Sequence, residues 1–247
     1  MMLYFTPEGQ IPAGEGFTLL GWQHLLMLAI LGTFTVLSLH WMRRLHTGEL
    51  NRLLRILGGV MLGLEVLKDL ILAVIGAFSV GYLPLHLCSL AMFVCLYYGA
   101  HPWSKNCGQI LYSVCFPGAM CALLFPDWTM FPILHFQSIH SFVYHTLLVQ
   151  VSLAPVVTGR IRPGLRQVWK SMAFLVAVAI PVGVLNRLLH TNYMFLGHPS
   201  AGSPLELLGN IPGRYGYLAG YFLLVLAVEI AMNLPWSIFT RRRQCKM

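Results

Sequence analysis

A thiol and several imidazoles stand inside apolar stretches of this 247-residue chain, where such side chains can perform nucleophilic chemistry. Within residues 83–89, Cys88 follows His86 by two positions and is itself followed by Ser89. A thiol attacks when a neighbouring base or cation favours its thiolate form. On an ideal helix Cys88 lies about 200° from His86, so we expect its base to come from another helix. The alternative is that Cys88 is a small apolar packing residue, as most buried cysteines are.

A polar stripe in the apolar stretch 131–157 offers such a base. At 100° per residue, its members fall within about 140° of one helix face. Two histidines in this stripe predict a polar cavity, with a polar seam between helices as the alternative. We expect His145 to act as general base, and His86 or His140 to orient groups or stabilise charge. The stripe consists of Gln137, His140, Ser141, Tyr144 and His145.

A charged group inside another apolar stretch is costly to place in hydrocarbon. Glu65, Lys68 and Asp69 share one helix face at positions i, i+3 and i+4, and they carry a surplus negative charge. Arg187 or a protonated histidine is the expected counter-charge. The group predicts either a functional site or a clamp that holds helices together, and both interpretations stay open.

Composition places all of these residues in a membrane. Hydrophobic residues make up 57% of the chain, charged residues make up 10%, and the mean hydropathy is +0.70. A soluble domain needs more polar surface than this, so we expect an all-α polytopic membrane protein with residues 1–247 in a single transmembrane domain. At roughly 20 residues per crossing, seven transmembrane helices fit. They are expected at about 17–42, 53–80, 82–100, 108–125, 131–157, 168–190 and 213–239.

The distribution of charge predicts the orientation of these helices. With the N-terminus outside and the C-terminus cytoplasmic, thirteen of the sixteen Lys and Arg residues fall in cytoplasmic segments and the adjoining helix ends. This bias is the pattern of the positive-inside rule, and it indicates a multi-pass protein of the cell membrane, either a bacterial inner membrane or a plasma membrane. The thirteen are Arg43, Arg44, Arg52, Arg55, Lys105, Arg160, Arg162, Arg166, Lys170, Arg241, Arg242, Arg243 and Lys246.

This topology brings polar residues from five spans and one loop into the outer half of the membrane. We therefore expect a hydrated cavity there, accessible to a lipid headgroup or a small polar solute. The expected partner is membrane lipid, with no nucleic acid, and the sequence does not define an oligomeric state. The converging residues are His24, Asp69, His86, His140, Arg187, Asn192 and Tyr193.

Metal and cofactor chemistry are not expected. A zinc site needs three or four ligands at fixed geometry, and the chain has no HxxxH or CxxC pattern. The six cysteines do not form a disulfide framework, because the expected outer loops hold no pair of them.

The segment 83–89, the helix with His140 and His145, and the segment 191–196 resemble the YwaF-type bacterial integral membrane protein family over nearly the whole chain. That family is distantly similar to a mammalian multi-pass ether-phospholipid acyltransferase that uses a cysteine and a histidine on separate helices. The resemblance implies the seven-helix fold, and His145 matches the histidine. The matching cysteine position falls on Leu85, so Cys88 would replace it only if the helix start is irregular.

Three functions follow from these residues. The favoured one is a phospholipid acyltransferase, transacylase or lipid hydrolase with Cys88 or Ser89 as nucleophile. The second is a proton-coupled transporter of a small solute, in which the group around Asp69 and the deeper Glu229 relay protons. The third is a non-catalytic membrane binding or sensor protein that uses the same cavity.

Overall fold

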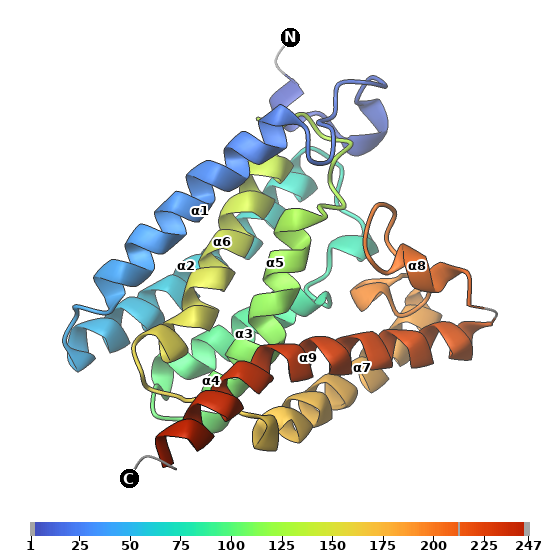
Figure 1. Cartoon of the computed structure of the whole chain (residues 1–247). Helices are drawn as coiled ribbons and strands as arrows, with labels where there is room; N and C mark the ends of the chain where they lie inside the picture. The colour runs from blue at the N-terminus through green and yellow to red at the C-terminus, as the bar shows by residue number, and fades with distance from the viewer. Residues whose placement is uncertain (1–2, 212, 245–247) are drawn as a thin grey trace.

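A computed structural model describes residues 3–211 and 213–244, with side chains up to residue 238 (Figure 1). This part of the chain is predominantly α-helical and contains no β-strand, which confirms the expected all-α class. Cys245 and Lys246 lie outside the described residues, as do the side chains of Arg241, Arg242 and Arg243. The α-helices are α1 (Trp22–Met42), α2 (Thr47–Val74), α3 (Leu87–Ala100), α4 (Lys105–Ile110), α5 (Phe116–Leu124), α6 (Phe136–Val157), α7 (Val168–Leu189), α8 (Glu206–Gly209) and α9 (Arg214–Gln244).

Six helical segments of the described chain are long and apolar enough to cross a membrane, so the protein is a multi-pass membrane protein. Helix α2, the second expected crossing, is 28 residues long but is not among the six. Every stretch of eighteen residues in α2 carries at least three charged side chains. The seventh crossing and the orientation of the chain remain predictions. The six are Trp22–Met42, Val80–Ala100, Lys105–Leu124, Phe136–Val157, Leu165–Leu189 and Arg214–Ile238.

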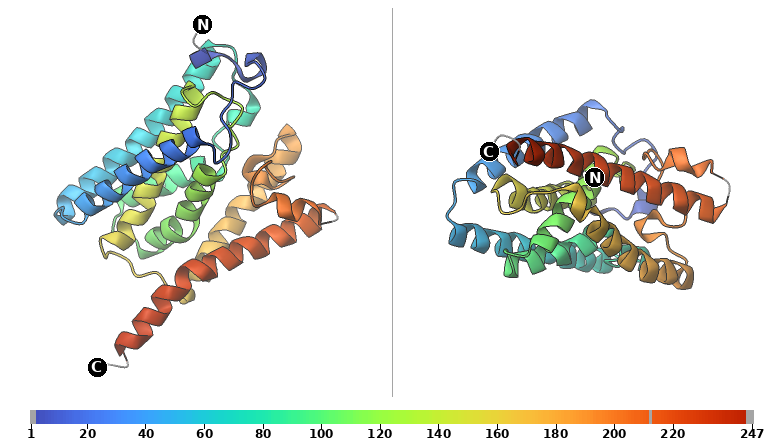
Figure 2. Two further views of the ribbon diagram at one scale, coloured as in Figure 1. Left: turned by 45° about the horizontal axis from the view of Figure 1, so that its top comes forward. Right: turned by 60° about the horizontal axis from the view of Figure 1, so that its bottom comes forward.

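The helices are arranged in two groups. Helices α1, α2, α3 and α5 all contact α6, which is the most buried of the six candidate spans. Helices α7 and α9 form a separate arm that contacts this bundle near α4 and the turn that follows it. Both groups are visible in Figures 1 and 2, where α7 and α9 lean away from the bundle. A cavity between the two groups holds the candidate functional site.

Helices α2 and α3 pack closely and run antiparallel. A Cβ atom added to Gly58 would lie 3.3 Å from Leu96 Cα, and one added to Gly99 would lie 3.0 Å from Arg55 Cα. Farther along α2, the Ser89 hydroxyl donates a hydrogen bond of 3.0 Å to Glu65. Residues farther along α2 thus contact residues nearer the start of α3, which means that the two helices run in opposite directions. Small residues at the contact let the two backbones approach each other.

The expected crossing at 108–125 is interrupted by a π-helical turn, Leu111–Cys115, between α4 and α5. Pro117 explains this turn, because proline has no N–H to donate to the carbonyl of Ser113 and its ring crowds that carbonyl. The wider turn changes the direction in which Ser113 and Cys115 project. Both residues line the main cavity of the protein.

Helix α3 begins at Leu87, five residues later than the expected start of the span at 82. Pro84 therefore precedes the helix and does not occupy its first turn. His86 is the residue just before the helix and has an extended backbone. The residue before a proline is disfavoured in helical conformation, which explains why no helix extends back through this segment.

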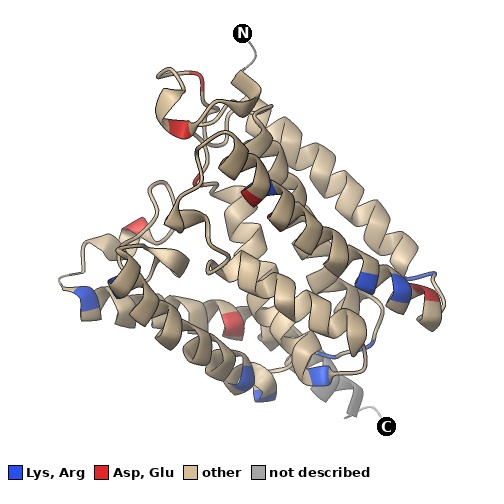
Figure 3. Ribbon diagram, turned by 180° about the vertical axis from the view of Figure 1, so that it is seen from behind, with Lys and Arg blue, Asp and Glu red and all other residues tan. Residues whose placement is uncertain are grey.

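Charge is distributed unevenly over the fold. Figure 3 shows Lys and Arg positions mostly near helix ends toward the side where the C-terminus lies. One group of opposite charges stands out in the middle of a long helix, where Lys68 lies between Glu65 and Asp69 of α2. Those two contacts are the ion pairs formed by the side chains that the structure describes.

Candidate functional site

A partly open cavity of about 980 Å³ lies between the bundle and the α7–α9 arm. One side is polar and is built by α2, the start of α3 and α6. The opposite side is apolar and is contributed by α7 and α9, including Leu175, Val176, Leu218, Phe222 and Val225. A cavity with one polar and one apolar wall fits an amphiphile better than a fully polar solute.

Ten residues predicted from the sequence line this cavity together. They include the thiol of Cys88 and three imidazoles from two different elements, so the segment before α3 and helix α6 face the same space. Their catalytic roles remain predictions. The ten are Glu65, Lys68, His86, Cys88, Ser89, Gln137, His140, Ser141, Tyr144 and His145.

The hydrogen bond of His145 defines which ring nitrogen is available. Its Nδ1 lies 2.7 Å from the backbone carbonyl of Ser141, one helical turn earlier. A carbonyl can only accept, so Nδ1 carries the proton and Nε2 of the neutral ring keeps its lone pair. The ring also stacks on Trp128, with centroids 5.3 Å apart and planes 16° apart. His145 is therefore held in the form that a general base requires.

The other two cavity imidazoles are held mainly by aromatic contacts. His140 stacks on Tyr144 at 5.5 Å, and its buried Nε2 has no hydrogen-bond partner among the described residues. His86 meets the ring of Tyr193 edge-on at 5.2 Å and lies 5.7 Å from the ring of Phe195. The His140 ring also lies close enough to the backbone of Leu64 on α2 to interact with it, and its Nε2 is covered by protein atoms.

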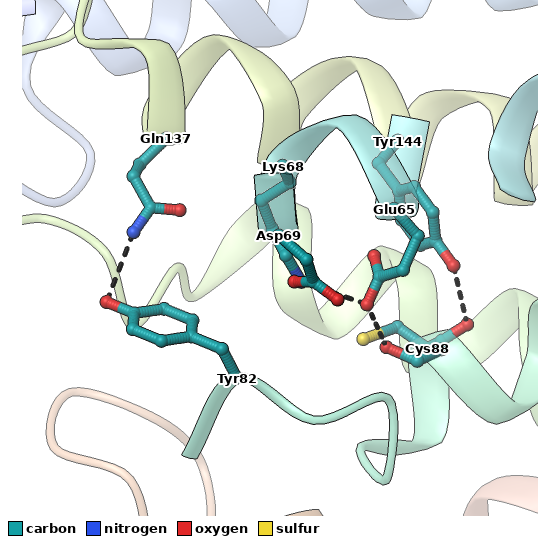
Figure 4. A network of polar contacts seen from close by, with 8 residues as sticks. Glu65, Lys68, Asp69, Tyr82, Cys88, Gln137 and Tyr144 are labelled. Atoms are coloured by element: carbon teal, nitrogen blue, oxygen red, sulfur yellow. Dashed lines mark hydrogen bonds and ion pairs between the residues drawn. The ribbon is translucent and has the colours of Figure 1, made fainter. Parts of the chain in front are cut away.

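Glu65 is the centre of a polar network on the same wall (Figure 4). Its Oε1 accepts hydrogen bonds from Lys68 at 2.9 Å and from Ser89 at 3.0 Å. Lys68 also lies 3.3 Å from a carboxyl oxygen of Asp69, so one cation serves two carboxylates. Arg187, the expected counter-charge, is exposed and forms no ion pair in the described part of the chain.

Hydrogen bonds to the backbone of α3 and to the segment before it fix two more polar side chains of the stripe. The Tyr144 hydroxyl donates to the carbonyl of Cys88 at 3.3 Å, and Gln137 donates to the hydroxyl of Tyr82 at 3.2 Å (Figure 4). Both contacts join α6 to the region of the expected nucleophile. The stripe is therefore a connection between helices as well as a cavity wall.

Five residues expected at the cavity lie apart from its lining. His24 is fully buried and bonds to two backbone groups, since its Nδ1 accepts from Leu20 N–H at 3.1 Å and its Nε2 donates to the carbonyl of Leu123 on α5 at 2.9 Å. Asn192 closes its own loop by accepting from Gly197 N–H at 2.8 Å. The five are His24, Asp69, Arg187, Asn192 and Tyr193.

Tyr193 supports the site from behind without lining it. Its side chain is 1% exposed, its hydroxyl donates to the backbone carbonyl of Val80, and its burial raises the pKa of the phenol. Leu85, the position matched to the enzyme cysteine, packs against the same small apolar cluster as Tyr193 and does not line the cavity. Cys88 is the thiol of this segment that lines the cavity. Helix α3 starts regularly at Leu87 after an extended N-cap residue, so the substitution of Cys88 for Leu85 stays a prediction.

The sequence did not single out several residues of the site. One of them is Trp128, which is 7% exposed, stacks on His145, and has a ring N–H without a partner in the described structure. Ser113 and Cys115 reach the cavity through the π-helical turn. Pro117 was the available signal for that turn, whereas nothing in the local pattern connected Trp128 to a histidine.

A second polar cluster lies between α4, the π-helical turn and α9. Gln109 donates to Ser113 at 2.7 Å and to Asn233 at 2.9 Å, and Asn233 donates to Ser113 at 2.9 Å. One turn earlier on α9, Glu229 is 1% exposed, and its carboxyl oxygens form no ion pair in the described structure, although the Ser171 hydroxyl of α7 lies close enough to interact with them. The nearby structure thus holds a carboxyl group that is costly to ionise.

Comparison with known families assigns the chain at this point. Residues 19–233 match the model of the TMEM164 family. The chain belongs to the TMEM164 family. The matched region contains the polar stripe, Cys88 and both walls of the cavity, so the candidate site is part of the TMEM164-family region.

The match to the TMEM164 family carries no named activity. No curated protein and no solved structure matches the chain. The resemblance to the YwaF-type family and the similarity to an ether-phospholipid acyltransferase therefore remain predictions from the sequence.

Proposed function

We propose that this protein is a membrane-embedded enzyme that transfers acyl groups of phospholipids, as a transacylase, an acyltransferase or a lipid hydrolase. The observation that carries the proposal is the cavity of about 980 Å³ in which Cys88 and His145 share a polar wall opposite an apolar one. The apolar wall suits an acyl chain, and the polar wall suits the ester and headgroup.

In the proposed reaction, Nε2 of His145 takes the proton of the Cys88 thiol. The thiolate forms a C–S bond with the acyl carbonyl carbon, the ester C–O bond breaks, and His145 returns the proton to the leaving oxygen. An acceptor hydroxyl then gives its proton to His145 and takes the acyl group, and the thiol is restored. A second lipid as acceptor gives transacylation, and water gives hydrolysis.

Two neighbouring groups support this assignment of roles. The hydroxyl of Ser89 is engaged with the carboxyl of Glu65, which makes Cys88 the better candidate for nucleophile. The side chains of Trp128 and His140 line the cavity, and a rotation of either ring would turn its covered nitrogen toward charge that develops on the substrate.

The test uses the full-length protein in proteoliposomes that contain a phospholipid with a labelled acyl chain. We expect Cys88→Ala and His145→Gln to lower acyl release or transfer by at least about a hundredfold, because each removes a group that acts in the transition state. Cys121→Ala is the matched control, since Cys121 lines the same cavity from α5 and has no assigned role. Full activity in the Cys88→Ala protein would contradict the proposal.

Glu229 favours a second candidate, a proton-coupled transporter of a small solute. A carboxyl group with 1% exposure and no ion-pair partner in the described structure is stable as the neutral acid, and a change in its surroundings would release the proton. Ser113, in the adjoining cluster, lines the main cavity, while its partner Gln109 lines a second pocket. Proton exchange through this cluster would connect the two spaces.

Solute uptake into proteoliposomes under an imposed pH gradient tests the transporter candidate. We expect Glu229→Gln to abolish gradient-driven uptake, because the amide cannot exchange a proton. Glu206→Gln is the control, since Glu206 is an exposed carboxylate of α8. Equal uptake by wild type and Glu229→Gln would eliminate Glu229 as the coupling residue. If neither acyl transfer nor uptake is found, the remaining proposal is a non-catalytic binding or sensor protein.

A further inference from the structure

A second cavity, of about 320 Å³, lies where the loop between α6 and α7 meets the start of α4. Three of the residues that line it are cations, Lys105, Arg160 and Arg162, and none of its lining residues is acidic. Gln109 and Gln167 supply the other polar side chains. We call this cavity the basic pocket.

The positive charge of the basic pocket is not neutralised within the described structure. Among the described side chains, ion pairs join Lys68 to Glu65 and Asp69 on α2, and none involves a residue of the basic pocket. Arg160 donates to the backbone carbonyl of Thr47 at 3.3 Å, which places the guanidinium but leaves its charge. Three cations around one concave space repel each other unless an anion enters it.

The loop that carries the two arginines is held firmly in place. Between them, Ile161 is 8% exposed and packs in an apolar cluster with Tyr112 and Val156. Its N–H donates to the Pro155 carbonyl at 3.1 Å. A Cβ atom at Gly108 of α4 would lie 2.9 Å from Ile161 Cγ2, so the loop rests directly on that helix. The backbone that carries both arginines is thus fixed before any ligand binds, which lowers the entropic cost of binding.

We propose that the basic pocket binds the phosphate group of an anionic ligand. Two guanidinium groups and one ammonium group match phosphate oxygens, because arginine offers paired N–H donors and lysine a compact positive charge. The phosphate belongs either to the headgroup of an anionic lipid or to a dissolved phosphate compound. The pocket is lined by residues distinct from those of the main cavity, so this proposal does not depend on the acyl-transfer or transport proposals.

A simpler explanation is that these cations only attract anionic lipid without a defined site. Arg166 separates the two explanations. It lies in the same loop, is exposed, and does not line the basic pocket. Arg162→Gln and Arg166→Gln each remove one positive charge from the same loop. Only Arg162→Gln changes the lining of the basic pocket.

The experiment uses the full-length protein in phosphatidylcholine nanodiscs and has two arms. In the first arm, inorganic phosphate is titrated by calorimetry. In the second arm, phosphatidic acid is added to the nanodiscs at increasing mole fraction, and bound lipid is counted by native mass spectrometry. Binding in the second arm alone identifies a lipid headgroup, and binding in the first arm identifies a dissolved phosphate compound as a ligand.

We expect Arg162→Gln and Lys105→Gln each to weaken binding by about tenfold, which is the effect of losing one charge-assisted hydrogen bond. We expect Arg166→Gln to leave the affinity unchanged. The proposal is overturned if neither ligand binds the wild-type protein, or if Arg166→Gln weakens binding as much as Arg162→Gln does. The side chains of Lys105 and Arg162 are exposed, and the melting temperatures of the variants verify that the fold is kept.

Discussion

Asn186 fixes the buried end of the loop behind the candidate site. Three non-glycine residues of this loop, His190, Met194 and Phe195, adopt positive φ values of 53°, 56° and 54°. Such conformations are unfavourable for L-residues and persist when the surroundings enforce them. Asn186 does so, because its side chain donates to the Tyr193 carbonyl at 2.9 Å and accepts from Tyr193 N–H at 2.8 Å.

Asn186→Ala is therefore expected to destabilise the protein by about 2–4 kcal/mol, since it leaves the buried N–H of Tyr193 without a partner and removes one of the two hydrogen bonds to the Tyr193 carbonyl. Thermal unfolding in detergent, followed by circular dichroism, measures the effect. Asn192→Ala is the comparison, because Asn192 bonds the more exposed end of the same loop, and it should cost less. Equal melting temperatures for the Asn186→Ala and wild-type proteins would show that the loop does not need this residue.

At the scale of single residues, the sequence predicted correctly which side chains of one helix face the cavity. The stripe of Gln137, His140 and His145 follows from helical periodicity alone, and all three line the cavity. His24 and Asn192 lie elsewhere because their polar atoms bond to nearby backbone groups, and a sequence pattern does not show which partner a side chain takes.

The pairing of α2 with α3 is the element-scale feature that positions Glu65 and Ser89. Gly99 lies against the α2 backbone, with 3.0 Å between its built Cβ position and Arg55 Cα. One position after Gly58 on α2, Gly59 has open space around its Cβ position. Gly99 of α3 therefore lies at a close contact between the two helix backbones, whereas Gly59 of α2 does not.

Gly99→Ala is expected to lower stability by about 1–3 kcal/mol, because the added methyl group pushes two backbones apart. Gly59→Ala should be neutral or stabilising by up to about 1 kcal/mol, since alanine favours a helix and meets no neighbour. Thermal unfolding of both variants under one condition provides the measurement. A lower melting temperature for Gly59→Ala than for Gly99→Ala would contradict the described packing.

Element boundaries show a similar limit of sequence-based prediction. The long helix of residues 136–157 was expected at 131–157, close to its true position. Helix α3 was expected to begin near residue 82, but a short 3-10 helix, Val80–Tyr82, and a turn at Pro84 precede it, and the helix starts at Leu87. The apolar wall of α7 and α9 was not predicted, since a residue that faces a cavity and one that faces lipid are equally hydrophobic.

At the scale of the whole molecule, the antiparallel contact between α2 and α3 bears on the number of crossings. The segment Val80–Ala100 is a candidate span, and α2 accompanies it from Ser89 to Gly99. We propose that α2 is the seventh crossing, with its charges directed at the cavity and at neighbouring helices, and that the N-terminus lies outside the cell membrane. Residues 1–247 would then form one transmembrane domain.

Accessible cysteines test this topology. In a protein whose natural cysteines are replaced, Glu15→Cys and Arg166→Cys flank α1, α2, α3, the α4–α5 segment and α6. If all five cross the membrane, a membrane-impermeant maleimide should label Glu15→Cys in intact cells and Arg166→Cys only after permeabilisation. Labelling of both positions from the same side would mean that α2 does not cross.

The apolar wall formed by α7 and α9 has a kinetic consequence if lipid is the substrate. A lipid that reaches the partly open cavity comes from the surrounding leaflet, where its abundance is a mole fraction and not a molarity. Turnover should then fall when the substrate is diluted with inert lipid at constant total substrate, and it should rise as the acyl chains of the bilayer become more fluid. The bilayer would act as the reservoir that saturates the enzyme.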